Sequence, residues 1–292
     1  SIAIAGFGPG SAPAISNGNL PLNPMYSNSA AGNFKLRGPC PVSPAVDAGM
    51  TNGLTQYDPT PVLGGARDMG AHESPFTNLY AGITNRFYVD DNSDVSDLYT
   101  PCAVGSDANS GRTPSTPKRT LTNLLSTYDL DPGDVVYVDT GTYTVAPVII
   151  ANSDADGTVA SPIRFVGPTN GVDFATMSNA SVLECLVLSN ARNVRIEGGF
   201  IIRGMAFEAV KLEAGAGSST TNIVIRGLRV LSNTAHGIWL NGANVDANRI
   251  ESNWIDGRGA QDQGVQIFDG DRNVITNNTI FGHVQNGVNF QW

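Results

Sequence analysis

Positive charge is scarce in this sequence, and its scarcity excludes two classes of partner. Lysine occurs only at Lys35, Lys118 and Lys211, and the formal net charge is −9 at pH 7. A protein that binds nucleic acid or anionic lipid needs a basic patch to meet the phosphates. We therefore expect no nucleic acid and no anionic membrane surface among its partners.

Long apolar runs and recognisable catalytic motifs are also missing. No apolar run approaches the roughly 20 residues that a membrane-spanning helix needs, so we expect no membrane insertion. The sequence contains no HExxH, P-loop, GxSxG or CxxC pattern. The first residues, SIAIAGFGPG, lack the basic and apolar regions of a signal peptide. We therefore expect a mature form or an internal piece of a longer chain.

Cysteine is rare, and its spacing matches no zinc motif. Cys185 lies in VLECLVL and shares strand parity with Leu183 and Val187, which predicts a buried small apolar side chain. Cys40 and Cys102 both lie in proline-rich loops. An extracellular location would allow a disulfide between them, but sequence cannot set the separation that such a bond requires.

What the sequence does contain is a repeat in its last hundred residues. A strand-like segment appears four times, as NVRIEGGFI, NIVIRGLRV, ANRIESNWI and RNVITNNTI, and each copy precedes a second short motif, AVKL, GIWL, GVQI or GVNF. The anchors are spaced by 29, 25 and 25 residues and are Ile196, Ile225, Ile250 and Ile275. A fixed period in this range is typical of a stacked repeat architecture.

Each repeat alternates apolar and polar residues, as short strands with one buried face do. Stacking would pair every strand with its copy in the next coil and produce a parallel β-solenoid. The in-register repetition favours this architecture over an antiparallel β-sandwich. Two internal ladders are expected, one of Ile201, Val230, Ile255 and Ile280 and one of Val210, Ile238, Val265 and Val288. Asn253 and Asn278 are expected at a bend, where asparagine suits left-handed backbone geometry.

The coils are preceded by a strand, a polar loop and a short helix. RFYV from Arg86 predicts the strand, and helical spacing of Leu121, Leu124, Leu125 and Tyr128 predicts the helix, with Asp131-Pro132-Gly133 ending it. Such a helix would cover the open end of a solenoid and protect its strand edges.

The polar loop is the candidate metal site. Calcium takes six to eight oxygen ligands, and Asp90, Asp91, Asp107 and Asn109 offer such oxygens beside turn-forming glycines. The alternative is a solvated turn without an ion, since no EF-hand spacing is present.

The coils carry few candidates for chemistry on sugars. Trp239 has the opposite parity to the core positions and is expected to face outward, and with Trp254 it is a possible carbohydrate contact. A lyase would need a base, for which Lys211 and Arg203 are the nearest candidates, and Lys211 is expected to be a solvated strand residue. A hydrolase would need two carboxylates. The candidates lie at coil corners, where aspartate also serves turn chemistry alone, and are Glu251, Asp256, Asp262 and Asp269.

Two blocks resemble a known family. YVDD…GSDANSGRTPSTPKRTL…DPGDVVYVDTGTY, from Tyr88 to Tyr143, resembles the opening motif of right-handed parallel β-helix repeat proteins, which occur in large bacterial surface and secreted chains. Pectate-lyase-like β-helix enzymes share a related motif, and some use calcium near similar loops. NPMYSN…GNFKL…CPVSPAVDAG…GGARDMGAHE resembles the closing motif of such domains. The resemblance implies an all-β, right-handed parallel β-helix with one short N-terminal capping helix.

The order of the two blocks is unusual, because the closing motif comes first. It suggests that residues 1–76 end one β-helix, that 77–133 hold the opening strand, acidic loop and capping helix, and that 134–292 form the coils of a second. We therefore expect an extracellular structural or adhesive module on a cell surface, in a tandem array or a head-to-tail filament that self-associates through solenoid ends. An arbitrary chain boundary would produce the same order. The alternative function is a polysaccharide-active enzyme, lyase-like or hydrolytic, or a carbohydrate-binding module.

Overall fold

The computed structural model describes residues 26–28, 33–36, 86–151 and 155–291, and divides the chain into two units, 1–84 and 85–292. In the first unit β1 (Tyr26–Asn28) pairs with β2 (Asn33–Leu36) in an antiparallel hairpin. The strand β2 lies within the GNFKL part of the block that resembles a closing motif. The rest of the predicted closing segment, 1–76, lies outside the described residues.

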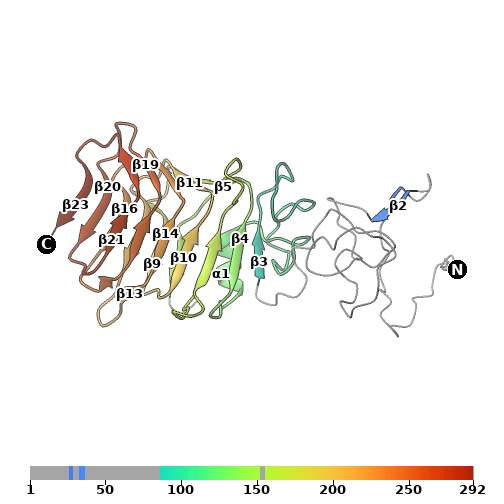
Figure 1. Cartoon of the computed structure of the whole chain (residues 1–292), viewed down its shortest axis with the longest axis horizontal. Helices are drawn as coiled ribbons and strands as arrows, with labels where there is room; N and C mark the ends of the chain where they lie inside the picture. Colours follow the sequence, from blue (N-terminus) through green and yellow to red (C-terminus); the bar gives the residue numbers. More distant parts are fainter. Residues whose placement is uncertain (1–25, 29–32, 37–85, 152–154, 292) are drawn as a thin grey trace, which may run out of the picture. The chain divides into compact units, whose positions relative to one another are not determined.

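The second unit is a parallel β-solenoid with three sheets along its length (Figure 1). Sheet I contains β3 (Arg86–Val89), β4 (Val135–Val138), β7 (Ile163–Val166), β10 (Val194–Glu197), β14 (Val224–Arg226), β18 (Arg249–Glu251) and β21 (Val274–Thr276). Sheet II contains β5 (Gly141–Thr144), β8 (Ala175–Ser178), β11 (Phe200–Arg203), β15 (Arg229–Leu231), β19 (Trp254–Asp256) and β22 (Thr279–Phe281).

Sheet III contains β6 (Val148–Ala151), β9 (Glu184–Ser189), β12 (Glu208–Glu213), β16 (His236–Asn241), β20 (Gln263–Phe268) and β23 (Asn286–Gln291). A short pair, β13 (Thr220–Thr221) and β17 (Val245–Asp246), lies at a corner. Each strand of the three sheets pairs in parallel with its copy in the next coil, which excludes the antiparallel sandwich and confirms the solenoid.

Ladders of apolar residues form the core, and one of the two predicted ladders needs correction. The anchors from Ile196 to Ile275 pair in register, and so do the residues from Val210 to Val288. In the other ladder Ile202, not Ile201, pairs with Val230 and is fully buried. The prediction of Ile201 was wrong because the Gly198–Gly199 corner is one residue longer than the corresponding corner of the next coil.

Asparagine side chains join the corners of successive coils. Asn253 and Asn278 occupy equivalent places, as expected, and Asn253 Nδ2 donates to Asn278 Oδ1 at 3.0 Å. Asn248 and Asn273 form a second such pair that the sequence analysis did not identify. The left-handed residue is the one before each ladder asparagine, such as Ser252 with φ 56°. Asparagine is therefore used here for its amide and not for its backbone conformation.

One helix accompanies the first coil. α1 (Leu121–Thr127) begins after Thr120, whose side chain accepts a hydrogen bond from Asn123 N, and its leucines join the solenoid core beside β6. The expected helix is confirmed, although it ends before Tyr128 and not at Asp131. Within the described residues no helix is long and apolar enough to cross a bilayer.

Candidate functional site

The most chemically diverse surface of the solenoid is the outward side of sheet III. The alternation of inward and outward side chains is interrupted near the start of β12 and β16, because Ala209 and Val210 are both buried, as are Gly237 and Ile238. As a result, the residue before each of these buried pairs lies on the outward side of the sheet, together with the residues that alternation itself places there. We call this set the Trp239 face, and its members are Glu184, Glu208, Lys211, Glu213, His236 and Trp239.

Two polar side chains, those of Lys211 and His236, flank the indole of Trp239. Lys211 Nζ lies 5.2 Å from the ring centroid, and the His236 ring lies 5.3 Å from it at an interplanar angle of 31°. His236 Nδ1 is 2.9 Å from Oε1 of Glu208, a side chain that is 1% exposed. A carboxylate at Nδ1 orients the imidazole and leaves Nε2 as the nitrogen that can exchange a proton with a ligand.

Lys211 is held by two carboxylates on the same face. Its Nζ lies 2.9 Å from Glu213 Oε2 and 3.6 Å from Glu184 Oε1. Burial acts to lower the pKa of Lys211, but the hydrogen bond to Glu213 and the surrounding acidic charges outweigh it and raise the pKa. Lys211 is therefore a fixed ammonium group and not the solvated strand residue that parity predicted, and a charged amine cannot serve as a general base.

The two predicted carbohydrate contacts lie on different sheets. Trp239 is in β16 and is partly covered, as the contacts above require. Trp254 is in β19 of sheet II, is 47% exposed and meets the Phe281 ring edge-on with a centroid distance of 5.2 Å. The structure therefore does not combine them into one binding platform.

The four candidate hydrolase carboxylates are also distributed over separate elements. Glu251 in β18 forms an ion pair with Arg249, and Asp256 in β19 accepts a hydrogen bond from Arg258 N. Asp262 and Asp269 lie at opposite ends of β20. The sequence analysis gave turn chemistry as the alternative for these residues; the hydrogen bond of Asp256 agrees with it, and the ion pair of Glu251 is a further structural role.

Three of the four predicted metal ligands have structural hydrogen bonds. Asp107 accepts from the backbone N–H groups of Arg119 and Thr120, ahead of α1. Asn109 Nδ2 donates to Pro117 O, and Asp91 accepts from Ser93 N and Thr142 N. Across 86–151 and 155–291, no three side chains of the acidic, histidine or cysteine type are gathered to hold a metal.

Asp90, the fourth predicted ligand, differs from the other three. It is fully buried, and burial, together with the charges of Asp97 and Asp139, raises its pKa to about 8. Burial likewise raises the pKa of Asp97 to about 7, with Asp139 as its largest charged neighbour. Neither carboxylate of Asp90 and Asp97 has a hydrogen-bond partner.

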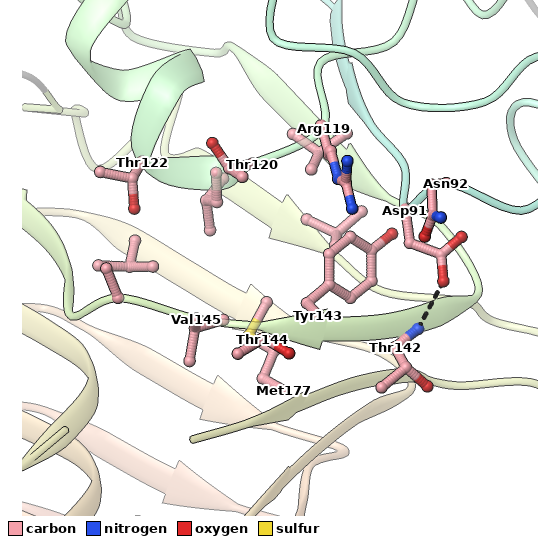
Figure 2. A pocket seen from close by; sticks show the side chains of 15 residues that line it. Asp91, Asn92, Arg119, Thr120, Thr122, Thr142, Tyr143, Thr144, Val145 and Met177 are labelled. Carbon is pink, nitrogen blue, oxygen red and sulfur yellow. Dashed lines mark hydrogen bonds between the residues drawn. The ribbon is translucent and has the colours of Figure 1, made fainter. Parts of the chain in front are cut away.

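A hollow of about 380 Å³ lies beside α1 (Figure 2). Its polar lining includes Asp91, Arg119, Thr142 and Tyr143. Both oxygens of Asp91 already accept backbone hydrogen bonds, and the Tyr143 hydroxyl donates to Asp139 O at 2.9 Å. The carboxylate of Asp91 and the hydroxyl of Tyr143 are therefore already engaged within the protein.

The cysteines divide into two kinds. Cys185 is a free thiol, 0% exposed, with Sγ 3.7 Å from Met177 Sδ, as predicted for a buried apolar residue. Cys102 is disulfide-bonded. Cys40 lies outside the described residues, so its pairing stays a prediction.

The sequence analysis missed the acidic half of the Trp239 face. Glu208 and His236 directly precede the AVKL and GIWL motifs, so aligning the repeats would have placed them in one column. Glu184 and Glu213 required the register of β9 with β12, in which Glu184 pairs with Glu208. The aligned repeats therefore contained the information, but strict alternation along the strand would have placed Glu208 on the buried side.

Comparisons with known proteins concern the solenoid. Residues 147–291 match the family described as right handed beta helix region. Among solved structures, an alginate lyase from Paenibacillus sp. str. FPU-7 is 18% identical, with a TM-score of 0.41, and the alignment covers 54% of each chain. A rhamnogalacturonan lyase is 15% identical, with a TM-score of 0.48, and the alignment covers 71% of this chain and 62% of the other. No curated protein sequence matches.

Proposed function

Since residues 147–291 belong to the right-handed β-helix family, we propose that the protein is an extracellular adhesive module that binds a neutral polysaccharide on its Trp239 face. The observation that carries the proposal is the aromatic side chain on the outside of sheet III, held between Lys211 and His236. Large aromatic residues flanked by fixed polar groups are typical anchors of binding surfaces.

The arrangement of the face suits an extended ligand. Its side chains lie on three successive parallel strands, β9, β12 and β16, and such strands lie about 4.8 Å apart. The Trp239 ring offers an apolar surface to the C–H face of a sugar. Carboxylate and ammonium groups beside it can exchange hydrogen bonds with hydroxyl groups along the chain.

The charge of the face favours a neutral polysaccharide. Glu184, Glu208 and Glu213 outnumber the single ammonium group of Lys211, and the whole chain has a net charge of −9. A polyuronate would bring further negative charge to this surface, and like charges that meet in an interface oppose binding. Acidic polysaccharides are therefore disfavoured as ligands of this face.

The extracellular part of the proposal is supported by the cysteines. Cys102 is disulfide-bonded, and disulfides persist mainly in oxidising compartments such as the cell exterior.

The test is a binding measurement with two matched tryptophan variants. Calorimetric titration of the whole chain with a panel of neutral and uronate oligosaccharides should show binding to a neutral one. Trp239→Ala should weaken it at least about 30-fold, the loss expected for an interface anchor. Trp254→Ala removes an equally large aromatic from another sheet and should leave affinity unchanged. Equal affinity of Trp239→Ala and the unsubstituted chain, or binding to polyuronates only, would refute the proposal.

Cleavage of the bound polysaccharide is a second candidate function, favoured by one observation. Glu208 orients His236 at 2.9 Å, as a positioning carboxylate does for a general base. Incubation with the bound oligosaccharide and analysis of product ends would detect cleavage. If it occurs, Glu208→Gln should reduce the rate by about 10²–10⁴-fold with little change in affinity. Intact oligosaccharide after prolonged incubation would restrict the function to binding.

Self-association through solenoid ends is a separate proposal. β21, β22 and β23 are the edge strands of their sheets among the described residues, and Phe290 in β23 is 56% exposed although it continues the buried Leu240–Ile267 column. A second copy or a further coil would cover this edge equally well. Light scattering across concentration should show oligomers that Phe290→Lys abolishes, and a monomer at every concentration would contradict the proposal.

A further inference from the structure

The loop that follows β3 is held against the solenoid by several hydrogen bonds, four of which end on one carboxylate. Asp139, which follows β4, accepts hydrogen bonds from the backbone N–H groups of Leu98, Tyr99 and Thr100 at 2.6–2.8 Å. The Thr100 hydroxyl also donates to Asp139 Oδ2 at 2.8 Å. Three backbone N–H groups and one hydroxyl of this loop therefore converge on the Asp139 carboxylate.

Two further carboxylates lie inside this loop without any donor. Asp90 is 0% exposed, and neither of its oxygens has a hydrogen-bond partner. The oxygens of Asp97 are buried and equally without a partner. Thr100 is the donor that interacts with Asp90, but its hydroxyl hydrogen is already directed to Asp139.

These acidic groups act on one another, and no positive charge offsets them. The charges of Asp97, Asp139 and Asp91 all oppose ionisation of Asp90, and Asp139 and Asp91 oppose that of Asp97. Among the described residues, no lysine, arginine or histidine contributes to the electrostatics of Asp90 or Asp97. Buried carboxylates in folded proteins are normally paired or bound to a metal, because an isolated one is strongly destabilising.

We propose that Asp90 and Asp97 bind one hard divalent cation, with calcium as the ion whose chemistry fits best. Both groups are oxygen donors, and their neighbours Asp91 and Asp139 add negative potential that attracts a cation. Two side chains do not fill the six to eight positions around calcium, so main-chain carbonyls and water supply the others. The ion would join the loop to β3, and it would replace the predicted ligand set, in which Asp91, Asp107 and Asn109 are already engaged.

The raised pKa values of Asp90 and Asp97 agree with this assignment. Without a cation, the two groups compete for protons near neutral pH. A cation removes that repulsion and allows both to be ionised.

The experiment is a thermal-unfolding series of the whole chain in EDTA and in millimolar CaCl₂, with MgCl₂ as a second probe. Calcium at about 100-fold excess over Kd should raise the Tm of the unsubstituted chain by at least about 5 °C. Asp90→Asn and Asp97→Asn should lose this response. In EDTA the same variants should melt higher than the unsubstituted chain, because each removes a repelling charge. Asp129→Asn makes the same charge change at an exposed position after α1 and should keep the full calcium response.

Direct titration of the unsubstituted chain with CaCl₂ by calorimetry keeps the proposal testable if a variant does not fold. We expect one binding event per chain. Absence of binding for both calcium and magnesium would overturn the proposal, and so would an unchanged calcium response in Asp97→Asn. Variants that melt higher than the unsubstituted chain in calcium as well as in EDTA would show that these carboxylates hold protons and not a cation.

Discussion

The asparagine ladder can be tested by removing one amide. Asn253 is 2% exposed, and its side chain satisfies two backbone groups of the preceding coil and contacts the side chain of Asn278 in the next coil. Its Oδ1 accepts from Leu228 N at 3.0 Å, and its Nδ2 donates to Ile225 O at 3.0 Å and to Asn278 Oδ1 at 3.0 Å. Asn253→Ala would leave the N–H of Leu228 and the carbonyl of Ile225 buried without partners.

The expected loss of stability follows from the two backbone groups that would be left without partners. An unsatisfied buried backbone group costs about 1–3 kcal/mol, and Leu228 and Ile225 are both 1% exposed or less. We therefore expect Asn253→Ala to lower the free energy of unfolding by about 3 kcal/mol, which corresponds to a fall in Tm of roughly 6–12 °C for a unit of this size. Asn253→Asp should be at least as destabilising, because a carboxylate oxygen would then face two acceptors.

Urea denaturation followed by circular dichroism measures the effect, and Asn244→Ala is the matched control. Asn244 is exposed in the same coil and should change the free energy of unfolding by less than about 0.5 kcal/mol. A loss below about 1 kcal/mol for Asn253→Ala, or equal losses for the two variants, would refute the ladder's stabilising role.

Three further predictions concern single residues. Gly237→Ala should destabilise the solenoid by more than about 2 kcal/mol in thermal unfolding, because an added Cβ would lie 2.5 Å from Gly264 O. Burial raises the pKa of the Cys185 thiol, so a thiol reagent at pH 8 should modify it only after unfolding. Burial lowers the pKa of His283, a shift that Asp256 partly opposes, so the stability present above about pH 6.5 should decline on acidification, and less in His283→Gln.

The repeat made the fold predictable because one period determines many pairings at once. When Ile225 and Ile250 are placed in register, each neighbouring residue of β14 and β18 is placed too. The internal column from Val210 to Val288 followed from the same reasoning and is confirmed. The error in the other column, Ile201 for Ile202, arose at a diglycine corner whose extra residue changes no apolar pattern.

The outward faces were less predictable, because their chemistry depends on where alternation fails. Ala209 and Val210 are both buried, so Glu208 and Lys211 emerge on the same side although they are three residues apart. A strict period of two places Glu208 in the core, where an unpaired carboxylate would be very costly. The pairing of Glu208 with His236 became visible only with the three-dimensional register.

The acidic loop shows why composition alone could not identify ligands. Asp107 and Asp90 are the same residue type in the same segment, yet Asp107 accepts three hydrogen bonds ahead of α1 and Asp90 accepts none. A carboxylate that already has its donors gains little from a cation, whereas a buried one without donors gains much. The distinction lies in the hydrogen-bond partners, which are set by the fold of the loop around Asp139. The cation is therefore expected at Asp90 and Asp97, where the protein supplies no donor of its own.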